Sequence, residues 1–356
     1  MAKIKLIRRE KESPLARVLV PVASVLMAFA VGWIILALAG HNPVLVYQKL
    51  YNGALGSPYA ISETIVKAIP LMIAGLAVSL AFRMKLWNIG AEGQIYIGAL
   101  AASWIALNLG QSSGPLVILP LMMIAAFAAG ASWGLIPGVL RAYWQVNETI
   151  ITLMLNYVAI YWVDYLIFGP WKDPNSMGFP LTPIFSAAAQ LPTWGDSRVH
   201  LGLLLAIIIA ILFYLGIQYT RWGYEVRVMG QSPSAARYAG MNVTKNIMLV
   251  MLISGGIAGI AGMIEVSGIT HRLQQGISPG YGYTAIIVAW LSRLNPLAII
   301  MVAFLFGALL VGGFAVQLVG VSFSITQVLQ GTVLFFLLAG EIFINYKIVL
   351  SHKEVL

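Results

Sequence analysis

Long apolar runs are the feature that most limits what this chain can fold into. Most of them approach the roughly 20 residues that an α-helix needs to cross a bilayer. Backbone amides in hydrocarbon must find partners within the protein, so such runs are predicted to be helices. Ten runs occur, at 18–39, 65–82, 94–109, 115–140, 149–168, 201–219, 247–267, 284–291, 297–319 and 325–344. We therefore expect an all-α integral membrane protein with about ten transmembrane helices, the run at 284–291 being a partial or broken one, in a single domain over 1–356.

The chemistry-bearing residues are few and scattered. Only 9% of the 356 residues are charged, against roughly a quarter in a soluble domain. The chain has no cysteine and four scattered histidines without an HExxH pattern, so no metal site is predicted. It has neither a GxxxxGK[ST] phosphate loop nor a catalytic triad pattern. We expect a chain that is not an enzyme and binds no cofactor of its own.

The positive charges predict an orientation. If the N-terminus is cytoplasmic and ten helices cross the membrane, sixteen of the 21 Lys and Arg residues lie on the cytoplasmic side, as in known inner segments. Lys347 and Lys353 fall on that side only when the short run at 284–291 is counted. The net charge of +9 therefore indicates topology and not nucleic-acid binding. A bacterial inner membrane location with both termini in the cytoplasm is predicted.

The first apolar run follows the basic stretch KIKLIRREK and therefore resembles a secretory signal. Its run at 18–39 is longer than the 7–15 apolar residues of a cleaved signal. A retained first helix is predicted, with a cleaved signal as the alternative.

Two segments outside the membrane are substantial. The extracytoplasmic loop at 169–200 contains five prolines, so a structured cap with at most a short helix is predicted. It either contacts a partner arriving from outside or is a passive connector. In the cytoplasmic segment 221–245, Ser232 is an N-cap residue, Pro233 suits the first helical position, and Gly240 suits the end of the helix.

The short helix so delimited contains Ala235, Ala236 and Arg237. A helix of about two turns is marginal unless something packs on it. Its small side chains fit a groove of a cytoplasmic partner, and the alternative is a helix that packs only on its own chain.

Glycines recur every four residues within two of the apolar runs. Gly130, Gly134 and Gly138 form one row, and Gly255 and Gly259 form another. Such rows let helix backbones approach closely, so helix packing is predicted.

A polar row runs along the helix predicted at 149–168. Glu148, Thr152 and Asn156 are four residues apart and share one helix face, with Asp164 further round. Polar groups in a membrane usually face a bundle interior or a wet cavity. The row predicts either a lined path or interhelical hydrogen bonds.

The stretch MKLWNIGAEGQIYIG, residues 84–98, interrupts the apolar pattern with amides, a carboxylate and glycines. Asn88 is predicted to cap the following helix. Glu92 lies in its first turn, where it either opposes the helix dipole or lines a path. A second glycine-interrupted segment, 276–296, occupies a matching place in the second half, and the proposed topology inverts the two halves. Paired interruptions of this kind indicate a transport path near the midplane.

The candidate path is rich in amides, hydroxyls and aromatic rings and lacks the cluster of Arg or Lys that a phosphate would require. A neutral polar solute is therefore favoured. The candidate path residues are Asn88, Glu92, Gln94, Asn156, Tyr281 and Tyr283.

Five stretches carry a resemblance to a known family: NPVLVYQKLYNGALGS, ETIVKAIPLMIAGLAVSLAFRMKLWNIGAEGQ, NETIITLMLNY, GQSPSAARYAGM and LSRLNPLA. Along nearly its whole length the chain is similar to permease subunits of bacterial ABC importers for nucleosides and related simple sugars. That branch works with basic-membrane-protein-type lipoproteins. Trp87 is a departure, because phenylalanine is more common before the asparagine, and the second interrupted segment is unusually rich in Tyr and Trp.

The resemblance implies an inverted-repeat permease architecture and three kinds of protein partner. They are a second permease, more often different than identical, an ABC ATPase that binds ATP, and an extracytoplasmic substrate-binding lipoprotein. It also implies that 221–245 is the coupling segment, with Ser232, Pro233, Ala235, Ala236, Arg237 and Gly240 as its candidate residues. We therefore predict an ATP-driven import permease that moves a nucleoside or simple sugar by alternating access.

Two alternatives to this function remain from the residues. An ion-coupled secondary transporter would use Glu92, Asp164 or Glu265 as its proton or sodium site. A membrane enzyme or assembly factor is the other alternative, for which no catalytic group can be named.

Overall fold

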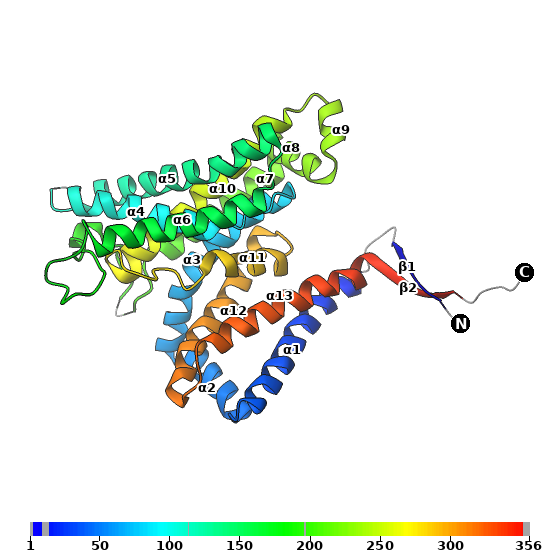
Figure 1. Cartoon of the computed structure of the whole chain (residues 1–356), viewed down its shortest axis with the longest axis horizontal. Coiled ribbons are helices and arrows are strands. Elements are labelled where there is room, and N and C mark those ends of the chain that lie inside the picture. The colour runs from blue at the N-terminus through cyan, green and yellow to red at the C-terminus, as the bar shows by residue number, and fades with distance from the viewer. Residues whose placement is uncertain (1–2, 9–13, 113, 196, 352–356) are drawn as a thin grey trace, which may run out of the picture. The chain divides into compact units, whose positions relative to one another are not determined.

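The computed structural model describes residues 3–8, 14–112, 114–195 and 197–351. A helix covers each of the ten apolar runs, so the helical prediction is confirmed (Figure 1). Seven of the helices in the described residues are long and apolar enough to cross a membrane. The ten helices are α1 (Pro14–Leu38), α3 (Pro58–Arg83), α4 (Ala91–Leu109), α5 (Pro115–Trp144), α6 (Glu148–Phe168), α7 (Gly202–Tyr219), α10 (Val243–Glu265), α11 (Tyr281–Leu291), α12 (Pro296–Ala315) and α13 (Ser324–Asn345).

The remaining elements are short. Three are α-helices, namely α2 (Pro43–Leu55), α8 (Arg221–Gln231) and α9 (Pro233–Tyr238). A 3₁₀ turn η1 (Ala187–Ala189), a π-helical turn η2 (Val266–Thr270) and a 3₁₀ turn η3 (Val316–Val319) complete the helical set. Strands β1 (Lys3–Arg8) and β2 (Tyr346–Ser351), which the apolar pattern does not predict, pair antiparallel with Lys3 opposite Ser351.

The chain forms two compact units. The first comprises the described residues up to Gly53 and those from Gly312, and in it α1 packs along α13 (Figure 1). A small apolar cluster of Leu36, Val46, Val316 and Val321 lies at its core. The second unit, Ala54–Val311, holds every candidate residue named above.

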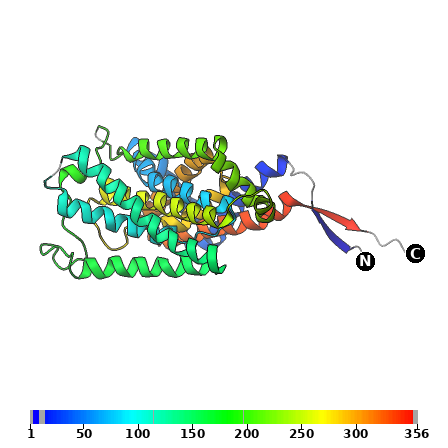
Figure 2. The same cartoon turned by 90° about the horizontal axis from the view of Figure 1, so that it is seen from above.

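The core of the second unit is α10, which packs against α5, α4 and α3. Both views show α4, α5 and α10 side by side (Figures 1 and 2). The glycine rows are the reason: a Cβ on Gly130 would overlap the carbonyl oxygen of Gly255, and one on Gly98 would overlap the backbone of Gly259. The prediction that these rows pack helices is confirmed, because backbone meets backbone wherever the rows cross.

The described residues of the loop at 169–200 contain one short helical element, the turn η1, which agrees with the predicted cap with at most a short helix. The loop is fixed to η2 and to His271, the residue that follows η2. Leu191 N–H donates to the carbonyl of Ser267 (3.0 Å), and Phe185 N–H donates to that of His271 (2.8 Å). The Ser267 hydroxyl donates in return to the carbonyl of Ala189 (2.6 Å). Non-helical backbone at this end of the unit is thereby satisfied within the protein.

Candidate functional site

The connection between α3 and α4, residues 84–90, is held by a buried amide pair. Asn88 Nδ2 donates to Gln94 Oε1 and Gln94 Nε2 donates to Asn88 Oδ1, both at 3.1 Å. Asn88 Nδ2 also donates to the hydroxyl of Ser254 on α10 (2.9 Å). The predicted helix cap is wrong in one respect: Gly90 is the N-cap of α4, and Asn88 Oδ1 accepts from the Gly90 N–H instead. The reason is that Asn88 lies two residues too early and turns towards α10.

Glu92 lies in the first turn of α4, as predicted, and its side chain reaches a second helix. Its Oε2 accepts from the backbone N–H of Gly282, in the first turn of α11, at 2.7 Å. A Cβ on Gly282 would overlap the backbone of Glu92, so glycine is needed for this approach. The carboxylate is 3% exposed and lies at the positive ends of two helices, which is where a buried negative charge is best stabilised.

Asn156 joins three elements. From α6, its Oδ1 accepts from Gly93 N–H of α4 (2.8 Å), and its Nδ2 donates to the carbonyl of Ile89 (3.0 Å). The same Nδ2 lies 3.2 Å from the hydroxyl of Tyr283 on α11. The amide is therefore the point where the two interrupted segments and α6 meet.

Glu148 and Thr152 lie on the same face of α6 and approach the backbone of Trp87 in the α3–α4 connection. Glu148 forms an ion pair with Arg141 of α5 (3.3 Å) and accepts from the backbone N–H of Trp87 (3.2 Å). The Thr152 hydroxyl donates to the carbonyl of Thr149 within α6 (3.0 Å) and lies 3.5 Å from the carbonyl of Trp87. The row thus makes interhelical hydrogen bonds, one of the two predicted alternatives. Asp164 is about two turns further along α6 and lies outside this network.

Tyr281 is fully buried beside a second polar group. Lys67 Nζ of α3 forms an ion pair with Glu265 Oε1 of α10 (3.3 Å) and lies 5.8 Å from the centre of the Tyr281 ring. The Lys67 charge is therefore already matched by a carboxylate. Within the residues that the structure describes, no three His, Asp or Glu side chains gather closely enough to hold a metal ion.

The six candidate path residues thus come together, although they are spread from 88 to 283 in sequence. Asn88 and Gln94 pair, Glu92 and Asn156 each bond to α11 or its tyrosine, and Tyr281 flanks Gly282. Tyr283 is the one that reaches an open face, with 37% of its surface exposed. What the structure shows is a hydrogen-bonded cluster of amides and phenols next to an uncovered face.

A row of tyrosines on α6 was missed by the sequence reasoning. Tyr157, Tyr161 and Tyr165 are 47%, 68% and 69% exposed and follow the open face of α6 beyond Asn156. Phenols usually gather at the two membrane interfaces, whereas this row begins in the middle of its helix. Their four-residue spacing is visible in the sequence and could have identified them.

The segment 221–245 folds as α8, α9 and the start of α10. Ser232 is the N-cap of α9, with its hydroxyl accepting from Ala235 N–H (3.2 Å), Pro233 is the first helical residue, and Gly240 has φ +76° after the last turn. The three end signals of this helix are confirmed. Ala236 is fully buried on its own chain, whereas Ala235 is exposed and Arg237 lies on the exposed side.

The segment 221–245 is also in direct contact with the α3–α4 connection. A Cβ on Gly230, near the end of α8, would overlap the carbonyl oxygen of Arg83, the last residue of α3. A displacement of α8 therefore meets the backbone immediately before the α3–α4 connection, residues 84–90.

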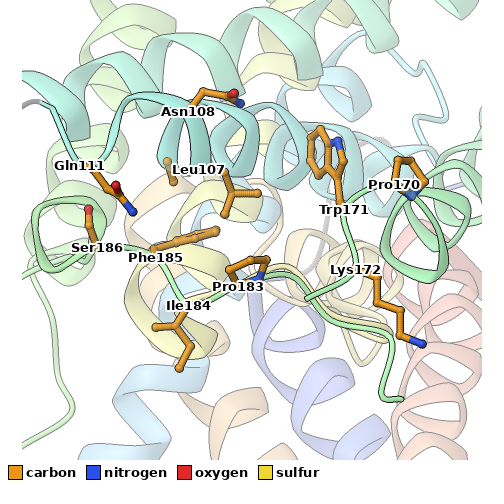
Figure 3. A pocket seen from close by; sticks show the side chains of 11 residues that line it. Leu107, Asn108, Gln111, Pro170, Trp171, Lys172, Pro183, Ile184, Phe185 and Ser186 are labelled. Carbon is orange, nitrogen blue, oxygen red and sulfur yellow. The ribbon is translucent and has the colours of Figure 1, made fainter. Parts of the chain in front are cut away.

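A cavity of about 370 Å³ lies between the end of α4 and the loop at 169–200. Asn108 and Gln111, from the end of α4 and the residues after it, line one side, and Trp171 and Phe185 from the outer loop line another (Figure 3). Its walls combine aromatic rings and amides, so the loop at 169–200 forms a pocket as well as a connection.

His200 ends the same loop and is completely buried. Burial, with smaller contributions from His271 and Arg198, lowers the pKa of His200 to about 4. Its Nδ1 accepts from the backbone N–H of Gly202 at the start of α7 (3.2 Å), which requires an unprotonated nitrogen.

Comparison with known proteins gives consistent results. The family model described as the permease component of branched-chain amino acid transport systems matches residues 60–338. The glucose ABC transporter permease protein TsgB13 of Haloferax volcanii is 38% identical over 92% of this chain and 89% of its own length. The guanosine ABC transporter permease protein NupP of Bacillus subtilis is 37% identical over 84% and 86%. A second guanosine permease of that organism, NupQ, is 28% identical over 69% of this chain and 79% of its own length.

Proposed function

The chain belongs to the family of permease components of branched-chain amino acid transport systems, and we propose that it is the membrane-spanning subunit of an ATP-driven importer. The helices that are long and apolar enough to cross a membrane support a multi-pass subunit. ATP binding and hydrolysis are assigned to a separate ABC ATPase. The sixteen cytoplasmic Lys and Arg residues support an inner-membrane orientation with both termini inside.

We infer that the imported solute is neutral and polar, and that it is a nucleoside or a simple sugar. The observation that carries this proposal is the cluster around Asn156, in which amides and the Tyr283 phenol meet beside an uncovered face. The nearby lysine, Lys67, forms an ion pair with Glu265, so its charge is not available to bind a phosphate. The named solutes of the relatives, glucose and guanosine, agree with this chemistry.

We propose that the uncovered tyrosines of α6 extend this cluster along the path. A phenol offers a flat apolar ring to a base or sugar and a hydroxyl that bonds to either. Contacts of this kind are weak one by one, which suits a path that must release its cargo. Tyr157 is next to Asn156 in the chain, so the row begins at the cluster.

Three protein partners follow from this assignment. A second permease is supported by the existence of two guanosine permeases in Bacillus subtilis, NupP and NupQ, both similar to this chain. The ABC ATPase is proposed to dock on α9, whose Ala235 is exposed, and to move α8 against Arg83. A substrate-binding lipoprotein is proposed to meet the outer loop at 169–200, where the cavity of Figure 3 opens.

The test is uptake by the complete complex. We would purify the chain with the ATPase and second permease that accompany it, reconstitute the complex in vesicles with its lipoprotein, and measure entry of labelled guanosine and glucose. Uptake that requires ATP on the ATPase side and resists a protonophore is expected. Uptake that proceeds without ATP and collapses with the protonophore would contradict the proposal. Phosphorylated sugars serve as the charged control and are expected not to enter.

A further inference from the structure

Three positively charged side chains line a cavity of about 360 Å³ beside α9. We call it the basic cavity, and we define it by Lys85 of the α3–α4 connection, Arg141 of α5 and Arg237 of α9, which all line it. Gln145 and Thr244 add polar side chains to its wall. Arg237 also belongs to the proposed coupling segment, whereas the path and coupling proposals give no role to the cavity as a ligand site.

The cavity carries uncompensated positive charge. Arg141 is paired with Glu148 (3.3 Å). Among the described residues, no acidic side chain forms an ion pair with Lys85 or Arg237, and both are exposed. A larger cavity nearby, about 660 Å³, differs because its cations Arg221 and Lys245 share it with Glu225, 3.7 Å from Arg221.

The level of the basic cavity in the membrane is marked by aromatic side chains. Tyr143 and Trp144, 63% and 66% exposed, follow Arg141 at the end of α5. Exposed Tyr and Trp at the end of a membrane helix lie at the level of the lipid headgroups. Arg141 is about one helical turn from Trp144, so the cavity opens where lipid phosphates lie.

We propose that the basic cavity binds the phosphate of an anionic phospholipid. Basic pockets between membrane helices on the cytoplasmic side bind such headgroups, and guanidinium and ammonium groups are the usual donors to phosphate oxygens. Gln145 and Thr244 add hydrogen-bonding groups, and Met84 and Leu86 on the same wall offer apolar surface to the glycerol and first acyl carbons. A bound headgroup bridges α9 and the α3–α4 connection.

Binding itself is independent of the transport proposal. An effect of the lipid on transport does rest on the proposed function. If α9 receives the motion of an ATPase, a bound anionic lipid would strengthen the attachment of α9 to the α3–α4 connection. A failure of lipid binding therefore counts against the cavity alone, while a failure of ATP-dependent uptake counts against the proposed function alone.

The experiment measures binding to the full chain in detergent. Phosphatidylglycerol, phosphatidylcholine with the same acyl chains, and inorganic phosphate are titrated separately, with native mass spectrometry and melting temperature as readouts. Phosphatidylglycerol is expected to bind and raise the melting temperature, and the other two are not. In Lys85→Gln/Arg237→Gln the half-saturating phosphatidylglycerol concentration is expected to rise roughly tenfold or more, since each basic residue contributes severalfold.

The matched control is Arg221→Gln/Lys245→Gln, which removes the same charge from the neighbouring cavity and is expected to leave binding unchanged. Equal weakening in both double variants would mean general attraction to the face and would overturn the site. Equal protection by inorganic phosphate would overturn the lipid as its occupant. Loss of ATPase binding in Lys85→Gln/Arg237→Gln with unchanged lipid binding would assign the cavity to the ATPase and overturn the proposal.

Discussion

At the scale of single residues, the Glu92 side chain connects two helices. It belongs to α4 in sequence, and its carboxylate accepts from Gly282 at the start of α11. Removing it would leave a buried N–H without a partner and a helix end without its negative charge. Both losses are local, so they can be measured without transport.

Substitution of Glu92 is therefore expected to lower stability in a graded way. Glu92→Ala should destabilise the chain by about 2–3 kcal/mol, and Glu92→Gln, which keeps an acceptor oxygen, by about 1 kcal/mol. Thermal unfolding in detergent would measure the difference. Equal melting temperatures for Glu92→Ala and the parent would show that the bond to Gly282 is not made in solution.

His200 gives a prediction for pH dependence. The folded pKa of about 4 lies below the usual 6.5, so the unfolded chain binds the proton first as pH falls. The stabilising contribution is thus complete above pH 6.5, is lost progressively towards pH 4, and amounts to about 3 kcal/mol.

The melting temperature is expected to fall between pH 6.5 and 4 in the parent and less steeply in His200→Asn, whose amide oxygen can still accept from Gly202. Asn175→Gln, an exposed change in the same loop, is the control and should keep the pH profile of the parent. Identical profiles for the parent and His200→Asn would refute the assignment to His200.

At the scale of elements, α9 offers a contrast between adjacent alanines. Ala235 is exposed and Ala236 is fully buried on its own chain. We hypothesise that a glutamate at 235 blocks the ATPase while leaving the fold intact, and that one at 236 also disturbs packing.

Uptake should therefore be lost in both Ala235→Glu and Ala236→Glu, whereas the melting temperature should fall only in Ala236→Glu. Asn52→Glu, an exposed change in α2 outside both proposed docking surfaces, is the control and should retain both properties. Normal ATP-dependent uptake by Ala235→Glu would exclude this surface of α9 as the docking site.

The glycine rows define the contact between α5 and α10. A methyl group on Gly255 would overlap the carbonyl oxygen of Gly130, whereas one on Gly216 of α7 would meet nothing within 4 Å. Gly255→Ala is expected to destabilise by about 1–3 kcal/mol through overpacking. Gly216→Ala should be neutral or stabilising by about 0.5–1 kcal/mol, because alanine favours the helix. Parallel melting curves of the two variants would test this contrast, and equal shifts would contradict it.

At the scale of the whole molecule, backbone contact links α8 to the buried cluster of the second unit. Gly230 of α8 touches the carbonyl of Arg83, and the stretch that follows carries Asn88, which bonds to Ser254 of α10. We hypothesise that this contact transmits motion from α8 to the cluster.

Gly230→Ala should push α8 away from Arg83 and lower the number of solute molecules imported per ATP hydrolysed by severalfold. Uptake and ATP hydrolysis would be measured on the same vesicles, with Gly216→Ala as the control. An unchanged ratio, with the variant folded, would show that α8 does not act through Arg83.

The helices and their local ends could be predicted from the amino-acid sequence. The ten apolar runs became helices because backbone groups in lipid have to bond within their own segment. The cap at Ser232 and the turn at Gly240 were readable because they depend on neighbouring residues only. The spacing of the glycine rows predicted close helix packing, but it did not predict which rows would contact each other.

Which buried polar atoms bond to one another could not be predicted without the folded structure. Glu92 and Gly282 are 190 residues apart, and Asn88 and Ser254 are 166 apart. From the sequence, Asn88 was expected to cap a helix and Glu92 to oppose the dipole of the same helix. Capping and dipole rules consider only residues that are close in sequence. The partners of these buried groups were fixed when the two interrupted segments packed against α6 and α10, since a polar group removed from water must bond to whatever the fold brings beside it.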